Sequence, residues 1–253
     1  MKSNGTAAKE DDIDDIVDPM VRAADAGELS DVVHVLCTTT KGPLHVEVYP
    51  EAWGSKGAER FLALVQSGLF STPVALHRAV KDFIIQFGTP GDGGAWAAAH
   101  RGEFPSFPDD PQWLPLGPAC GPKRKHNKGP CLRHRKGFLS FAGGGKNSRR
   151  IEMFVSLKDT GHGGDGKQAM WEVPFGRVVP RSFPVLDQLY TGYGEMKSFG
   201  GKAPPSGAIA RDGVGFLKTD YPLLDYITSC EVVEVEGKKE HGKEEGAGAG
   251  AAG

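Results

Sequence analysis

The sequence predicts a mainly β fold, a closed antiparallel eight-stranded β-barrel capped by two α-helices. Short apolar segments of strand length recur along the chain, whereas only two well-separated segments of its central part have the spacing of amphipathic helices. The 253 residues include 36 glycines and 18 prolines, a content typical of a β-rich fold with many turns and long loops. Many short strands with two separate helices favour a barrel closed by helices at its ends.

The expected elements follow one another along the chain. The first two strands form a hairpin with the turn Thr40–Pro43, and Gly57–Gly68 is expected to be the first helix because its apolar residues share one face. A second helix is expected at Val185–Tyr190. Pro174 lacks an N–H, so the strand that contains it is expected at an edge or a bulge. The expected strands are Val32–Thr39, Leu44–Tyr49, the segments around Arg78 and Ile84, Phe138–Ala142, Met153–Leu157, Val173–Val178 and Tyr226–Val235.

The composition along the chain predicts one domain between two polar ends. Residues 1–30 form an acidic N-terminal arm, residues 31–236 form the domain with a basic loop insert at 111–136, and residues 237–253 form a low-complexity tail. Apolar residues between Ile13 and Val21 have helical spacing, so the arm forms either a short amphipathic helix or a disordered, weakly docked segment.

Composition also limits the function classes. A net charge of −2 argues against a nucleic-acid binder that acts through bulk electrostatics, and no apolar run is long enough to span a membrane. No apolar leader is visible at the N-terminus. A cytoplasmic or nuclear location is therefore favoured, although a secretory route is not excluded.

The four cysteines leave two interpretations open. Cys37 and Cys230 lie in the first and last expected strands, which would be neighbours in a closed barrel, so a disulfide is conceivable there. Cys120 and Cys131 bracket the basic insert with a spacing that suits a loop-closing disulfide better than a zinc site. Because the cysteines are few and form no CxxC pair, reduced thiols are the default expectation.

The segment Leu76–Gln86 carries the strongest functional signal. Alternation places Arg78 and Val80 on one face of a strand, and Ile84 and Gln86 on one face of the next. An arginine on such an apolar strand must find a partner or line a cleft, because a buried unpaired charge is costly. The segment is therefore a candidate floor for a binding groove.

Five motifs in this order resemble those of cyclophilin-type peptidyl-prolyl cis/trans isomerases. They are GAERFLAL at 57–64, HRAVKDFIIQFG at 77–88, GFLSFA at 137–142, MFVSL at 153–157 and PFGRV at 174–178. The likeness extends from about Val32 to Val235, and the joint order and spacing are specific where any one motif is not. The resemblance implies an enzyme that assists protein folding by rotating X–Pro bonds. It also implies no cofactor and no metal, a monomer, and the proline-containing segments of client proteins as partners.

The resemblance assigns roles to individual residues. Arg78 matches the catalytic arginine, whose permanently protonated, rigid fork of donors suits hydrogen bonding to the prolyl nitrogen. The substrate-binding positions that the resemblance implies are His77, Phe83, Ile84, Gln86, Ala142, Gly143, Glu152, Phe154 and Glu172. Taken singly, Phe83, Ile84 and Phe154 are better explained as core residues than as pocket residues, and only the joint spacing of the set favours a proline pocket.

Two positions depart from the family pattern. Glu152 stands where the family usually has a glutamine, and Glu172 stands where it has a histidine at the pocket rim. These carboxylates are expected to pair with Arg78 and to reduce what it offers the substrate. The alternative to an active isomerase is a catalytically weak proline-peptide binding module or a scaffold. The basic stretch 123–136 is either a solvated loop or a docking site for an acidic or RNA partner.

Overall fold

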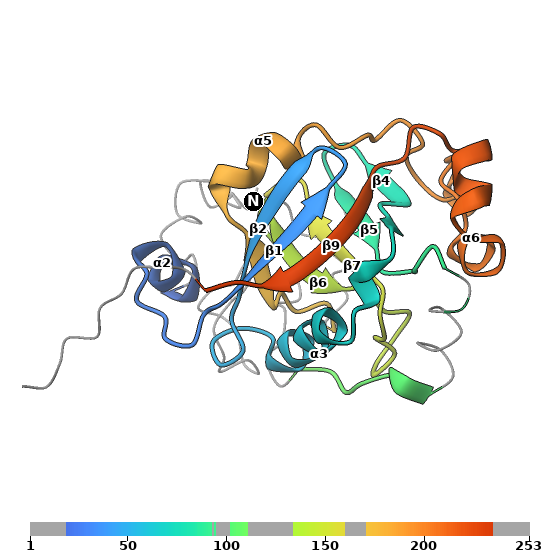
Figure 1. Ribbon diagram of the computed structural model, residues 1–253. Coiled ribbons are helices and arrows are strands. Elements are labelled where there is room, and N and C mark those ends of the chain that lie inside the picture. The colour runs from blue at the N-terminus through green and yellow to red at the C-terminus, as the bar shows by residue number, and fades with distance from the viewer. Residues whose placement is uncertain (1–18, 93, 95–101, 111–133, 160–170, 235–253) are drawn as a thin grey trace, which may run out of the picture.

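The computed structural model describes residues 19–92, 94, 102–110, 134–159 and 171–234 (Figure 1). Its centre is one antiparallel sheet with the strand order β3-β9-β1-β2-β8-β6-β7-β5-β4. The strands are β1 Val33–Thr39, β2 Gly42–Val48, β3 Val74–Ala75, β4 Arg78–Val80, β5 Ile84–Phe87, β6 Phe138–Phe141, β7 Met153–Ser156, β8 Gly176–Val178 and β9 Tyr226–Val232. The mainly β prediction is confirmed. The strand β8 begins after Pro174, which cannot donate to the sheet, and it pairs with β2 and β6, so the expected edge position is wrong.

The two edge strands are neighbours in the chain. Only Leu76 and His77 separate β3, which pairs with β9, from β4, which pairs with β5. The sheet is accordingly curled, as Figure 1 shows. It has nine strands where eight were expected, and the strand pairs among the described residues do not themselves join its two edges.

The hydrophobic core lies on the concave side of the sheet. Alternate residues of the central strands point into it, among them Val46, Ile85 and Met153. The helix α3 Ser55–Gln66 adds Phe61, which is fully buried, so the expected first helix is confirmed. The second expected helix is α5 Phe183–Leu186, which begins and ends earlier than predicted, with a proline in its first turn.

Two helices lie outside the expected barrel caps. The helix α2 Pro19–Ala26 packs Val21 and Ala24 against the domain, so the last part of the expected acidic arm is a docked helix. The helix α6 Ser206–Asp220, kinked at Gly213, was not predicted. Short 3₁₀ turns occur at Leu69–Ser71, Pro180–Ser182 and Lys197–Phe199. Within the described ranges, every helix is too short or too polar to cross a bilayer.

A disulfide joins the first and last strands. Cys37 of β1 lies directly opposite Cys230 of β9, and the two sulfur atoms are bonded. The predicted proximity is confirmed, whereas the default expectation of reduced thiols is wrong for this pair. Cys120 and Cys131, with the whole stretch 123–133, lie outside the described residues.

Candidate active site

A row of side chains crosses four strands on the face of the sheet that points away from the core. Arg78 of β4 lies opposite Gln86 of β5, Gln86 lies opposite Phe154 of β7, and Phe154 lies opposite Ser140 of β6. Their chain neighbours, such as Ile85, belong to the core on the other face. Because side chains alternate along a strand, the row is presented as one surface.

Arg78 is held by two partners. Its Nε and Nη2 donate to the two carboxylate oxygens of Glu195 at 2.6 and 2.7 Å, and its Nη1 donates to Oε1 of Gln86 at 3.0 Å. The side chain is 16% exposed. The arginine therefore keeps access to solvent while its orientation is fixed, which satisfies the requirement that a charge on an apolar strand be paired.

Apolar side chains flank the arginine. Ile84 and Phe154 are buried to 3% and 2% exposure, yet both lie on the sheet face opposite the core. Phe83, in the turn between β4 and β5, places its ring 5.9 Å from the Arg78 guanidinium carbon. His134 stacks on Phe154 with the ring centres 5.5 Å apart. Of the three predicted pocket residues, Phe83 contacts Arg78, whereas Ile84 and Phe154 share its face of the sheet, with Gln86 between Phe154 and Arg78.

Glu152 does not contact Arg78 directly. Its carboxylate accepts hydrogen bonds from Thr89 and, at 3.2 Å, from the side-chain amide of Gln86, and it lies 3.5 Å from Nε2 of His77. Glu152 therefore orients Gln86, which in turn orients Arg78. The expected direct pairing of Glu152 with Arg78 is wrong, because Gln86 lies between them.

Glu172 lies at the other border of the row. Burial raises the pKa of its carboxyl to about 7, although the Gly143 N–H and the positive charges of Arg78 and Arg149 act in the opposite direction. The indole of Trp171 donates to the Gly143 carbonyl at 3.0 Å. Gly143 therefore lies between a carboxyl and an aromatic ring, and Glu172 influences Arg78 through its field and makes no ion pair with it. Ala142 continues this border, with its N–H bonded to the Glu152 carbonyl.

The direct carboxylate partner of Arg78 was missed by the sequence analysis. Glu195 follows a Tyr-Gly pair in a loop that carries no apolar periodicity, and its position depends on tertiary folding. Thr89 and His134 were missed for the same reason. The Arg78 motif itself gave one usable signal, since a charge on an apolar strand requires a partner somewhere in the fold.

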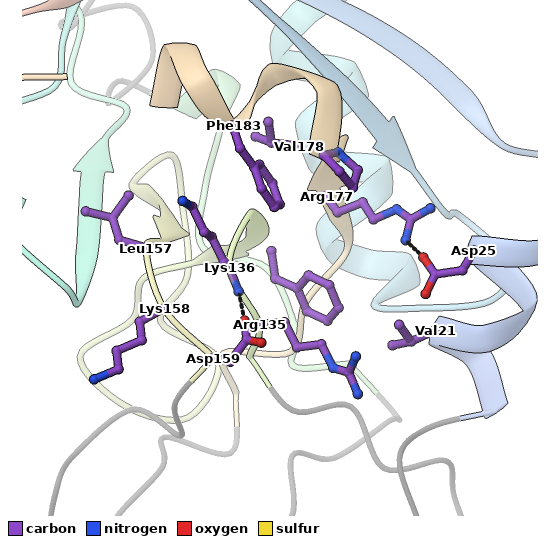
Figure 2. A pocket seen from close by; sticks show the side chains of 12 residues that line it. Val21, Asp25, Arg135, Lys136, Leu157, Lys158, Asp159, Arg177, Val178 and Phe183 are labelled. Carbon is purple, nitrogen blue, oxygen red and sulfur yellow. Dashed lines mark hydrogen bonds and ion pairs between the residues drawn. The ribbon is translucent and has the colours of Figure 1, made fainter. Parts of the chain in front are cut away.

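A separate hollow of about 500 Å³ lies between α2, β8 and the start of α5. Figure 2 shows Asp25 pointing toward Arg177 on one side of it, with Lys136 and Phe183 on another. Arg177 also donates to Glu47 at 2.8 Å and so ties α2 to the sheet. The side chains of the Arg78 row do not line this hollow.

Chemically, the row combines a fixed cation that retains free N–H groups with an apolar wall. Such a surface can hold an apolar ring and donate hydrogen bonds to a polar atom beside it. A curled antiparallel sheet with this outward-facing row is the arrangement of a cyclophilin-like fold. Residues 34–206 match the family model described as cyclophilin type peptidyl-prolyl cis-trans isomerase/CLD, and the chain belongs to that family.

Curated relatives agree with this assignment. The chain is 28% identical over 159 residues to peptidyl-prolyl cis-trans isomerase 10 of Caenorhabditis elegans, a match that covers 60% of this chain and 79% of the relative. It is 31% identical over 141 residues to peptidyl-prolyl cis-trans isomerase-like 2 of Gibberella zeae, covering 56% of this chain and 20% of the relative. The chain thus spans about a fifth of that longer protein.

Solved structures share the fold. A cyclophilin type peptidyl-prolyl cis-trans isomerase of Cryptosporidium parvum superposes with a TM-score of 0.51 at 19% identity, covering 81% of this chain and 99% of that one. The cyclophilin AquaCyp293 of Hirschia baltica gives a TM-score of 0.52 at 16% identity, covering 79% and 73%.

Proposed function

We propose that this protein catalyses cis/trans isomerisation of X–Pro peptide bonds in segments of other proteins, with Arg78 as the catalytic donor. The observation that carries the proposal is the row Arg78–Gln86–Phe154, in which Gln86 lies between a fixed guanidinium and a buried aromatic ring on one face of the sheet. The membership of the family supports the same activity.

The chemistry requires neither an acid-base pair nor a cofactor. Rotation about a peptide bond is opposed by a barrier of about 18–20 kcal/mol because the C–N bond has partial double-bond character. A hydrogen bond from Arg78 to the prolyl nitrogen draws its lone pair out of resonance and stabilises the twisted state. Phe83, Ile84 and Phe154 form the wall for the pyrrolidine ring. The backbone at Ala142 and Gly143 borders the peptide. His77 contacts the site indirectly, because its Nε2 lies 3.5 Å from the carboxylate of Glu152.

The test is a comparison of Arg78→Ala with the wild-type chain in a protease-coupled assay on a short prolyl peptide. Arg211→Ala is the matched control, because Arg211 is an exposed arginine of α6 paired only with its neighbour Asp212 among the described residues. We expect wild type and the control to accelerate isomerisation equally and Arg78→Ala to lose at least about tenfold in kcat/KM. Equal rates for wild type, Arg78→Ala and buffer would refute the enzyme.

A second function is supported by a specific observation. Glu195 forms an ion pair with Arg78, and Glu152 accepts a hydrogen bond from the side-chain amide of Gln86. Both contacts use donors that a substrate would otherwise bind, so the site also suits a module that holds proline segments and turns them over slowly. Binding of a prolyl peptide without acceleration would establish this alternative. Docking of an acidic or RNA partner at residues 123–136 remains a separate prediction, and absent or salt-insensitive binding of RNA would exclude the RNA version.

Further properties of the chain remain proposals. The sheet forms a closed barrel, whose two edges are joined by the chain at Leu76 and His77. Residues 31–236 form the cyclophilin-like domain, and the protein is a monomer. A cytoplasmic or nuclear location also remains a prediction. The Cys37–Cys230 disulfide counts against it, since such bonds are rare in reducing compartments.

A further inference from the structure

We propose that Glu195 is a positioning residue that holds the guanidinium of Arg78 in a single orientation on the face of the sheet that points away from the core. The inference rests on the proposed function, because it assigns Glu195 a part in the same reaction. Its basis is the two short hydrogen bonds that join one edge of the guanidinium to both oxygens of the carboxylate. Such a bidentate contact fixes direction as well as distance.

The contacts also determine which donors of Arg78 remain for a substrate. A guanidinium has five N–H groups in a planar fork. Glu195 takes one from Nε and one from Nη2, and Gln86 takes one from Nη1. One N–H on each terminal nitrogen is left, so the arginine is fixed at two edges and retains a pair of donors that point away from Glu195.

The loop that carries Glu195 is itself anchored. Gly194 forms a bridge with Ala79, the residue next to Arg78 on β4. On the other side, the Met196 N–H donates to Oε1 of Glu195 at 2.8 Å, and the Ala203 N–H donates to its carbonyl at 3.0 Å. Because backbone bonds hold both flanks, the carboxylate is presented as a fixed group rather than as a mobile surface side chain.

Position 201, which packs against the backbone of Glu195, requires a glycine. A Cβ placed on Gly201 would lie 1.7 Å from the Glu195 carbonyl oxygen and 2.2 Å from its carbonyl carbon. No side chain fits there unless the backbone of Glu195 moves. Gly201→Ala should therefore displace the carboxylate without removing it. Gly207 is a matched control, since a Cβ there meets nothing within 4 Å.

The carboxylate also carries a charge that opposes the arginine. Partial burial raises the pKa of Glu195, but the hydrogen bonds from Arg78 and Met196 outweigh it, so the pKa lies below its ordinary value and the group is ionised at neutral pH. The negative charge of Glu195 weakens the electrostatic field of Arg78 at the substrate, whereas its hydrogen bonds fix the direction in which the Arg78 donors point. Glu195→Gln keeps an acceptor oxygen and removes the charge, and Glu195→Ala removes both.

The first experiment observes the arginine without reference to catalysis. We would measure solvent exchange of the Arg78 Nε–H and rotation of its guanidinium by ¹⁵N NMR in wild type, Glu195→Gln, Glu195→Ala, Gly201→Ala and Gly207→Ala. We expect slow exchange and restricted rotation in wild type and Gly207→Ala, and at least about tenfold faster exchange in Glu195→Ala and Gly201→Ala. Equal exchange in wild type and Glu195→Ala would overturn the proposal.

The second experiment measures kcat and KM for a prolyl peptide with the same variants. Glu195→Ala and Gly201→Ala should lower kcat about tenfold with little change in KM. The reason is that a misplaced Arg78 donor stabilises the transition state less, while substrate binding in the ground state hardly depends on it. Glu195→Gln should give a kcat between those of wild type and Glu195→Ala, because its single oxygen accepts only one of the two Arg78 hydrogen bonds and its amide nitrogen faces the other donor. If Glu195→Ala equals wild type in kcat, the positioning role is refuted. If the wild type itself is inactive while its Arg78 Nε–H is protected, the proposed function fails and the fixed orientation stands.

Discussion

Glu172 makes the stability of this protein depend on pH in a direction opposite to that of most carboxylates. Its pKa rises from an ordinary value of 4.5 to about 7 in the folded chain, chiefly through burial. The native state therefore holds this proton more tightly than the unfolded chain does. The stabilisation is complete below about pH 4.5, declines as the pH rises, and is lost above about pH 7.

The magnitude follows from the same values. At about 1.36 kcal/mol for each unit of pKa, the rise from 4.5 to about 7 corresponds to roughly 3 kcal/mol of unfolding free energy. Urea unfolding followed by tryptophan fluorescence between pH 5 and 8.5 would measure it, with wild type compared with Glu172→Gln. The glutamine is uncharged at every pH, so the difference between the two proteins should grow with pH and level off near pH 7.5.

Other groups that titrate or carry charge near Glu172 are accounted for by this comparison. Arg78 and Arg149 are present in both proteins, as is His134, whose Nε2 donates to the Glu172 carbonyl at 2.9 Å. A pH dependence that is identical in wild type and Glu172→Gln would show that Glu172 is not its source, and the reasoning from burial would be refuted.

Two further predictions concern the frame that holds the site. Arg149 and Asp110 form a fully buried ion pair at 2.6 Å, so Arg149→Ala should cost about 3–5 kcal/mol by leaving the aspartate unpaired. A loss below about 1 kcal/mol in urea unfolding would contradict the importance of this pair. Replacing both Cys37 and Cys230 with serine should lower the unfolding free energy by about 2–4 kcal/mol, because the bond closes a loop with a sequence separation of 193. Dithiothreitol should destabilise wild type by a similar amount and leave the double variant unchanged. Alkylation of both thiols in the untreated protein would show that the bond is absent.

The sequence was sufficient for those parts of the fold and site that depend on local pattern. Alternation correctly grouped Arg78 with Val80 on one face of β4 and Gln86 with Ile84 on one face of β5, because successive side chains of a strand point to opposite faces. The helix α3 was predicted for a similar reason, since its apolar residues share one face and a glycine follows it. The proximity of Cys37 and Cys230 followed from placing the first and last strands side by side, whereas the bond between them was not the expectation.

The parts that were missed depend on tertiary contacts or on residues with weak local preferences. The helix α6 contains Gly207, Gly213 and Gly215, which lower its helix propensity and interrupt the apolar periodicity by which a helix is predicted. Glu195 reaches Arg78 only because the loop folds on itself between Tyr193 and Ala203. No periodicity in the sequence encodes that path, so the partners predicted for Arg78 were two other glutamates, Glu152 and Glu172.

The central claim is that Arg78 stabilises the twisted X–Pro bond, and exchange NMR on a short Ala-Pro peptide tests it most directly. Uncatalysed isomerisation takes tens to hundreds of seconds at 25 °C, so cis and trans signals do not exchange on the timescale of the experiment. Catalytic amounts of the wild-type protein should produce cis–trans exchange peaks, and Arg78→Ala of equal thermal stability should give none above the free peptide. Exchange peaks of equal intensity from the two proteins would contradict the account.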